Sequence, residues 1–174
     1  MTHRQGASIS SSVGEMAGST RATVVLDDAG AIYQVHRYDV PGKVGAGYGE
    51  AVAAAIGMGH ARVFKTLVAE VDGEPVIAVI PVDRRLSTKK LARAVGAKHC
   101  SLVSPAIAER ETGYVTGGIS PFGQRKRHRL VLDSSARDHE TIAVSGGQRG
   151  LQLELAPQTL LALTDGSVAL IVDD

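Results

Sequence analysis

The sequence predicts an α/β (α+β) fold with a mixed, barrel-like β-sheet and helices packed outside it. Three observations support this class. Strand signals outnumber helix signals, at least one hairpin has to be antiparallel, and the helical segments carry recognisable caps. A chain of 174 residues is long enough for one domain with a substantial core, and we expect residues 19–174 to form it.

The N-terminal segment differs from the rest of the chain. Residues 1–18 are rich in Ser and Gly and show no apolar period, which predicts a disordered tail. No apolar run suits a secretory signal, and none approaches the roughly 20 residues of a membrane span. The single cysteine, Cys100, excludes an internal disulfide and a cysteine-rich metal cluster. We therefore expect a cytoplasmic protein without a membrane segment.

The first third of the chain alternates helix and strand signals. The segment 19–30 offers Ser19 or Thr20 as an N-cap, although its Val-Val-Leu centre would suit a strand equally well. Residues 31–38 alternate apolar and polar side chains, which predicts a strand, and the Ala-rich residues 49–57 predict a short helix.

The clearest secondary-structure signal is the segment 61–81. Two apolar, β-branched runs flank Asp72-Gly73, as expected for an antiparallel hairpin. Two capped helices follow, over 87–96 and over 104–113. The remaining signals predict four strands, at 129–133, 140–144, 151–155 and 168–172. They also predict one helix, over 156–163.

Two glycine pairs predict sharp turns or close ligand contact. "TGG" at 116–118 recurs as "SGG" at 145–147, each followed by a cation and another glycine. Each pair alone is best interpreted as a tight turn at a strand end. Two such loops in one chain nevertheless make a shared pocket worth proposing.

The usual motifs of catalysis are missing. "GAGYGE" at 45–50 lacks the preceding buried strand of a dinucleotide site, and no phosphate-binding lysine loop is present. The six histidines show no metal-ligand spacing, so we expect no metal and no cofactor. No GxSxG nucleophile elbow occurs, and Cys100 is best interpreted as a small buried apolar residue.

Two polar residues interrupt strand patterns. Lys65 stands in the apolar run "VFKTLV", either on an edge strand with its ammonium in solvent or at a pocket floor facing a phosphate or ribose oxygen. The pattern favours neither alternative. Tyr38, in "VHRYD", is either half-buried core or a pocket hydroxyl, and the pattern favours the core.

A basic run follows the first glycine loop directly. Arg125, Lys126 and Arg127 stand in "QRKRHR", although the chain has a net charge of only +1. Most charge runs are solvated faces, but this position favours contact with RNA phosphates. With no Trp, two Phe and four Tyr, the chain would hold nucleic acid by charge rather than by serial base stacking.

Three blocks together resemble one protein family. "VFKTL", "ETGYVTGGISPFGQRKR" and "TIAVSGGQRGLQLELAP" are similar to the free-standing bacterial Cys-tRNA(Pro) deacylases of the YbaK group. That group belongs to the superfamily of the editing domain inserted in bacterial prolyl-tRNA synthetase. The resemblance runs from about Thr20 to the C-terminus and leaves the N-terminal tail outside.

The resemblance implies a compact fold, an activity and a set of site residues. Relatives hydrolyse cysteine from wrongly charged proline tRNA and act beside prolyl-tRNA synthetase, so both are expected partners. The family's lysine matches Lys65, its pocket tyrosine matches Tyr38, and Tyr48 stands where relatives usually have Phe. We expect Lys65, Gly117 and Gly118 to be catalytic. The expected substrate-binding residues are Tyr38, Tyr48, Ile119, Ser120, Pro121, Gly146 and Gly147, and the expected tRNA-binding residues are Arg125, Lys126 and Arg127.

The resemblance also explains the missing nucleophile. It implies that the substrate's own thiol attacks its ester carbonyl and leaves as a thiolactone, while backbone amides stabilise the oxyanion. Two alternatives remain open: a deacylase of the same superfamily for another aminoacyl-tRNA, such as Ala-tRNA(Pro), and a non-catalytic tRNA-binding adapter.

Overall fold

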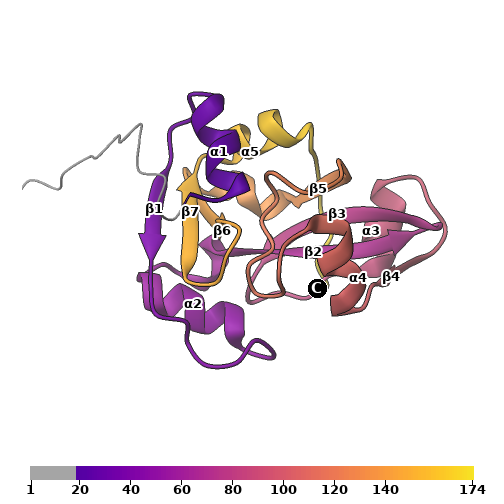
Figure 1. The fold of residues 1–174 in the computed structure, drawn as a ribbon. Coiled ribbons are helices and arrows are strands. Elements are labelled where there is room, and N and C mark those ends of the chain that lie inside the picture. The colour runs from indigo at the N-terminus through magenta and orange to yellow at the C-terminus, as the bar shows by residue number, and fades with distance from the viewer. Residues whose placement is uncertain (1–18) are drawn as a thin grey trace, which may run out of the picture.

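The computed structural model describes residues 19–174, and the tail expected over residues 1–18 lies outside the described residues. Helices and strands alternate along the described chain, and the strands form two sheets (Figure 1). In chain order the elements are α1 (Arg21–Asp28), β1 (Gln34–Arg37), α2 (Tyr48–Ile56), η1 (His60–Arg62), β2 (Phe64–Val71), β3 (Glu74–Pro81), α3 (Thr88–Ala94), β4 (Cys100–Leu102), α4 (Pro105–Thr112), β5 (Arg129–Asp133), η2 (Ser134–Asp138), β6 (Ile142–Ser145), β7 (Leu151–Leu155), α5 (Pro157–Thr164) and β8 (Ser167–Ala169).

The larger sheet has the strand order β4-β2-β3-β5-β8. The predicted hairpin of β2 and β3 is confirmed, with Asp72 and Gly73 at positive φ in its turn. β5 and β8 join the hairpin in parallel, which makes the sheet mixed as expected. β4 pairs with β2 only over Ala69–Val71, so the first half of β2 has a strand neighbour in this sheet on one side only.

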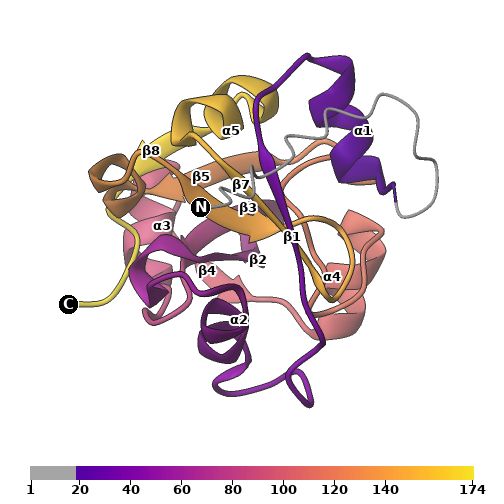
Figure 2. The ribbon, with the colours of Figure 1, turned by 90° about the vertical axis from the view of Figure 1, so that its left-hand side faces the viewer.

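The smaller sheet is antiparallel, in the order β1-β7-β6 (Figure 1), and Figure 2 shows β1 in front of β7. Leu151, Leu153 and Leu155 of β7 are fully buried on one face, while Gln152 and Glu154 alternate with them on the other. The two sheets meet at one isolated parallel bridge between Val63 and Ala143. The mixed α+β class is therefore confirmed, whereas the expected barrel-like closure is not, because the strands divide into two sheets.

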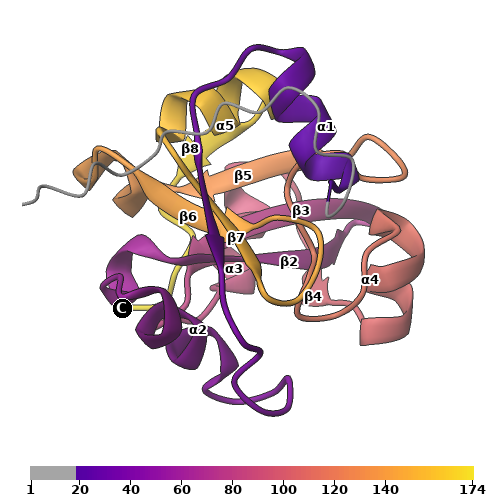
Figure 3. The ribbon, with the colours of Figure 1, turned by 60° about the vertical axis from the view of Figure 1, so that its left-hand side comes forward.

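The helices lie around the two sheets (Figure 3), where they cover three separate clusters of buried side chains. α1 and α5 pack Leu26 and Leu160 into the main core, together with the leucines of β7. α3 packs Leu91 against another cluster that includes Ala78 and Ile80 of β3. α2 covers a third, small cluster around the bridge between the sheets. None of the helices within residues 19–174 is long and apolar enough to cross a membrane.

Candidate functional site

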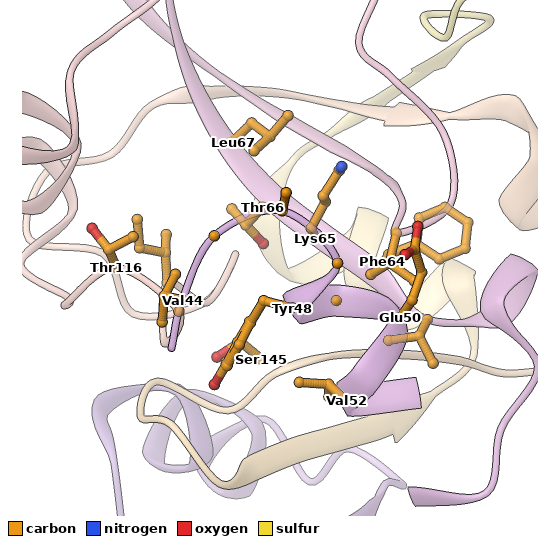
Figure 4. A pocket seen from close by; sticks show the side chains of 18 of the residues that line it. Val44, Tyr48, Glu50, Val52, Phe64, Lys65, Thr66, Leu67, Thr116 and Ser145 are labelled. Atoms are coloured by element: carbon orange, nitrogen blue, oxygen red, sulfur yellow. The ribbon is translucent and has the colours of Figure 1, made fainter. Parts of the chain in front are cut away.

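A cavity of about 730 Å³ opens beside β2, between α2 and the glycine-rich loop that follows α4 (Figure 4). It lies where β2 has no strand neighbour from β4, so side chains from both faces of β2 reach it. Its lining comes from segments distant in sequence, within 44–52, 63–68, 82–85, 102–108 and 116–119, together with Ser145 and Gln152. The lining includes neither cysteine nor histidine.

Lys65 extends from β2 into this cavity, away from the side chain of Tyr48 (Figure 4). The side chain is half-buried, and burial is the main cause that lowers the pKa of its ammonium group. The nearby carboxylate of Glu50 opposes this shift, and Arg85 adds to it. Within residues 19–174 Lys65 forms no ion pair, so its ammonium is available to a ligand oxygen.

Gly117 lines the cavity at the loop after α4. Its φ is +86°, and a Cβ at this position would lie 2.7 Å from Cγ2 of Val44, so only glycine fits without movement. The preceding residue, Thr116, is held firmly: its amide and hydroxyl donate to Oε2 of Glu109 at 2.7 and 3.0 Å, and its carbonyl accepts from Nε of Arg149 at 2.8 Å. The Thr116 amide is the main cause that lowers the pKa of Glu109.

The rest of the predicted glycine loop packs behind the cavity. The Gly118 amide already donates to the carbonyl of Val115 at 2.9 Å, and a Cβ on Gly118 would lie 2.9 Å from Cα of Gln148. The two glycine loops therefore lie against each other, but Gly118 is not part of the cavity wall. Ile119 lines the wall, whereas Ser120 and Pro121 are buried outside it.

The second glycine pair forms a tight turn between β6 and β7. The Gly146 amide donates to the carbonyl of Leu151 at 2.9 Å, and the Gly146 carbonyl accepts from the hydroxyl of Thr20. A Cβ on Gly147 would lie 2.9 Å from Cε1 of Tyr114. Neither glycine lines the cavity, so the structure gives both a role in the turn.

The two predicted tyrosines differ in position. Tyr48, at the start of α2, lines the cavity, and burial is the main cause that raises the pKa of its hydroxyl. Tyr38 does not line the cavity. It lies behind the lining residue Gln152, whose Nε2 donates a hydrogen bond to the Tyr38 hydroxyl at 3.4 Å. The structure therefore brings Lys65, Tyr48, Gly117 and Ile119 together in one cavity, with Tyr38 behind Gln152.

The predicted basic run is exposed and lies apart from the cavity lining. Arg125, Lys126 and Arg127 precede β5, and Nζ of Lys126 lies 3.4 Å from Oε2 of Glu111 on α4. Sequence reasoning missed two cations nearer to the site, Arg84 and Arg85, which line the cavity just after β3. Their only signal was a pair of arginines directly after a buried strand.

Sequence reasoning also missed the uncharged polar residues of the wall. Thr66, Ser145 and Gln152 are buried and line the cavity. A polar residue that alternates with leucines, as Gln152 does, looks the same in sequence whether its face meets solvent or a pocket. Cys100, in contrast, lies in β4 outside the cavity lining, and burial raises the pKa of its thiol.

Comparisons with known proteins identify the relatives of this chain. A family model for the aminoacyl-tRNA editing domain matches residues 46–163. A candidate Cys-tRNA(Pro)/Cys-tRNA(Cys) deacylase, EbsC of Enterococcus faecalis, is 43% identical over 121 residues, which cover 69% of this chain and 74% of the relative. The multifunctional Ser/Thr-tRNA deacylase ProXp-y of Escherichia coli K12 is 32% identical over 117 residues, covering 65% of this chain and 67% of that one.

More distant matches include a proline–tRNA ligase and two solved structures. A proline–tRNA ligase of Geobacter is 36% identical over 86 residues, which cover 49% of this chain and 15% of that much longer one. A solved structure of the hypothetical protein APE2540 has a TM-score of 0.79 and 22% identity, over 88% of this chain and all of that one. The solved structure of a candidate trans-editing enzyme for prolyl tRNA synthetase has a TM-score of 0.78 and 22% identity, over 88% of this chain and 96% of that one. The structures show the fold, and the family model covers more than half of the chain, so this chain belongs to the aminoacyl-tRNA editing domain family.

Proposed function

We propose that this protein is a trans-editing hydrolase that deacylates mischarged Cys-tRNA(Pro). One observation carries the proposal: a partly desolvated lysine without an ion pair, Lys65, shares a cavity with Gly117 and with no cysteine or histidine. Such a cavity can bind and orient an aminoacyl end, but it lacks an activated nucleophile of the usual kind. Membership of the editing family and the names of the relatives in Enterococcus faecalis and Escherichia coli support the same substrate class.

The proposed reaction uses the substrate's own sulfur. The cysteinyl thiol attacks its ester carbonyl, a carbon–sulfur bond forms, and the bond to the ribose oxygen of the terminal adenosine breaks. The thiol proton passes to that ribose oxygen, which leaves free tRNA and a cysteine thiolactone. Water then opens the thiolactone to cysteine. The protein gains rate by holding the thiol and the ester in register.

Each site residue has a role in this proposal. The Gly117 amide makes no backbone hydrogen bond within the described chain and would stabilise the oxyanion, whereas the Gly118 amide is already engaged. Lys65 would bind a phosphate or ribose oxygen of the terminal adenosine. Tyr48 and Ile119 would form the wall around the aminoacyl group. Ser120, Pro121, Gly146 and Gly147 would hold the shape of the two loops, and Tyr38 would position Gln152.

The wider setting belongs to the proposal as well. Residues 19–174 would act as a single editing domain with a barrel-like arrangement of its two sheets. The protein would work in the cytoplasm beside prolyl-tRNA synthetase. Arg125, Lys126 and Arg127 would contact the body of the tRNA.

Release of labelled amino acid from Cys-tRNA(Pro), Ala-tRNA(Pro) and Ser-tRNA(Pro), at catalytic amounts of protein, tests the function. We expect Cys-tRNA to be cleaved far faster than Ser-tRNA, because a thiol is the better nucleophile at neutral pH. Preferred cleavage of Ala-tRNA would instead show an alanine deacylase, and binding without turnover would show an adapter. The variant Cys100→Ala should keep full activity, and loss of turnover with an intact fold would rule out substrate-assisted attack.

A further inference from the structure

Three buried oxygens without a partner belong to residues of the cavity wall. They are the hydroxyl of Tyr48, Oγ1 of Thr66 and Oε1 of Gln152. Within residues 19–174 no other buried side-chain nitrogen or oxygen lacks a hydrogen bond. Buried polar groups are nearly always paired, because an unpaired one has lost its hydration without compensation. All three exceptions coincide with a single site, which indicates that a ligand completes them.

The three residues come from different elements that meet at one place. Val63 and Ala143 form a parallel bridge that brings the start of β2 close to β6, and Thr66 of β2 and Ser145 of β6 both line the cavity. Ser145 is in turn the register partner of Gln152 on β7. Tyr48, Thr66 and Ser145 border the same space in Figure 4. We call Tyr48, Thr66 and Gln152 the polar floor of the cavity.

Gln152 is held with its amide in a defined direction. Its Nε2 donates to the hydroxyl of Tyr38 at 3.4 Å, which leaves Oε1 as the atom without a partner. Burial and then the nearby Tyr38 raise the pKa of the Tyr48 hydroxyl, although the two hydroxyls do not meet in hydrogen-bonding geometry. The floor therefore presents one amide acceptor and two hydroxyls, each of which can donate and accept.

The floor carries no charge, although charged groups occur elsewhere in the cavity. Lys65, Glu50 and Arg85 line other parts of the wall, where a phosphate or an ammonium group would find an opposite charge. A neutral set of donors and acceptors matches a neutral group that can both donate and accept. A carbon-only side chain would leave all three oxygens unpaired, whereas a hydroxyl or thiol would pair some of them.

We propose that the polar floor recognises the side chain of the aminoacyl group and selects small side chains that end in a hydroxyl or thiol over apolar ones of the same size. This inference rests on the proposed function, because it assigns the substrate class of the same site. The selection acts on binding. A hydroxyl side chain binds at least as well as a thiol, while the thiol reacts faster once it is bound.

Stable substrate analogues separate binding from chemistry. Seryl and alanyl groups joined by an amide to 3′-amino-3′-deoxyadenosine differ by one hydroxyl and cannot be cleaved as esters. We expect the wild-type protein to bind the seryl analogue at least about tenfold more tightly by calorimetry. Tyr48→Phe and Thr66→Val each remove one oxygen and keep the shape, and Gln152→Met removes the amide, Oε1 together with the Nε2 that donates to Tyr38. Each variant should reduce the preference for the seryl over the alanyl analogue severalfold. The alanyl analogue should bind to each variant as tightly as to the wild type, or more tightly.

Matched controls make the same chemical changes outside the cavity. Tyr33→Phe removes a hydroxyl that donates to Asp27, and Thr164→Val removes one that donates to the carbonyl of Leu160. Both controls should keep the wild-type preference. If the floor variants bound both analogues equally less tightly than the wild type, the inference would be overturned, because the floor would then hold the α-amino group or the ribose. A wild-type protein that binds both analogues equally would overturn it too.

The same preparations distinguish this inference from the proposed function. If wild-type protein cleaves Cys-tRNA but the floor variants leave the preference unchanged, only the polar-floor assignment fails. If wild-type protein cleaves no aminoacyl-tRNA, the proposed function fails whatever the analogues show.

Discussion

Lys65 holds a positive charge where burial disfavours it. The largest cause of its lowered pKa is desolvation, and the carboxylates of Glu50 and Asp83 offset this only in part. A site of this kind is destabilising for the empty protein and favourable for an anionic or oxygen-rich ligand. Lys65 is therefore better explained by ligand binding than by stability.

Replacing Lys65 with Met tests this explanation, since Met keeps most of the volume and loses the charge. We expect deacylation of Cys-tRNA to fall at least about 100-fold, because the terminal adenosine loses a charged group that positions it. The melting temperature should stay the same or rise. The control Lys89→Met, at an exposed position on α3, should change neither property. Activity within a few-fold of wild type would place Lys65 outside the site.

The pH dependence of stability follows from the same lowered pKa. Below the folded-state pKa, Lys65 is protonated in both the folded and the unfolded chain. Folding then carries the full free-energy cost of partly burying its ammonium group. As pH rises through the folded-state pKa toward 10.5, the folded protein releases this proton first and the cost disappears. The wild-type protein should therefore gain unfolding free energy relative to Lys65→Met over this window, as measured by urea denaturation. If the difference in unfolding free energy between the wild type and Lys65→Met stayed constant with pH, it would contradict the lowered pKa of Lys65.

The sequence could reveal site residues only where they break a pattern. Lys65 interrupts an apolar strand, and Gly117 stands in a pair of glycines, so both were predicted, and both line the cavity. Thr66 and Gln152 fit an ordinary strand pattern, and their importance arises from what packs opposite them. That information depends on contacts between β2, β6 and β7, which are distant in sequence.

At the scale of elements, the loop between α4 and Ile119 is positioned by its neighbours rather than by its own sequence. Glu109 of α4 fixes Thr116 from one side, and Arg149 fixes the same residue from the loop between β6 and β7. Val44 closes against Gly117 from the segment before α2. Three elements thus determine where the Gly117 amide lies.

Gly117→Ala should therefore disturb the cavity, while Gly73→Ala provides a matched control. Both residues have φ of +86°, so both substitutions bear the cost of about 1–2 kcal/mol for a left-handed residue. Only at position 117 would the new Cβ meet another side chain within 4 Å, since nothing lies that close to Gly73. We expect a similar loss of stability in both variants and a large loss of deacylation only in Gly117→Ala.

A second substitution tells whether the contact with Val44 is the cause. Val44→Ala removes Cγ2, the atom 2.7 Å from the added Cβ. Combined with Gly117→Ala it should restore part of the activity. If the double variant is no more active than Gly117→Ala alone, the contact with Val44 is not the cause, and the positive φ of Gly117 or the contact of the added Cβ with Nε of Arg149 at 3.1 Å governs the loop.

Local signals predicted the elements well, and tertiary pairing explains the exceptions. The strands expected at 129–133 and 151–155 coincide with β5 and β7, because each is a short apolar run bounded by polar or glycine residues. The segment with the Val-Val-Leu centre is helix α1, capped by Thr20. β4 was not predicted, because its three residues become a strand only by pairing with Ala69–Val71. The division into two sheets depends likewise on pairing, which no local signal reports.

At the scale of the whole molecule, two groups of cations matter for tRNA. Lys65, Arg84 and Arg85 line the cavity, whereas Arg125, Lys126 and Arg127 lie on the surface beyond α4. A tRNA whose 3′ end enters the cavity extends well beyond it, so its body can reach the second group. The two groups should therefore affect different steps, the first the reaction at the ester and the second the affinity for the RNA.

Changing Arg125, Lys126 and Arg127 together to Ala tests this division. Each lost phosphate contact should lower the slope of log affinity against log salt by about one, because fewer counterions are released on binding. The rate at saturating tRNA should change little, since these side chains lie outside the cavity lining. Lys126 is expected to contribute least, because Glu111 already neutralises part of its charge.

A control with the same loss of charge separates local contact from net charge. Lys89, Arg93 and Lys98 are exposed on and after α3, and none of them lines the cavity. Their joint change to Ala should leave the salt slope unchanged. Fluorescence anisotropy with labelled tRNA at several salt concentrations measures affinity and slope together. If the 125–127 variant keeps the wild-type slope, or the control flattens it equally, the run is only a solvated face and the tRNA body is held elsewhere.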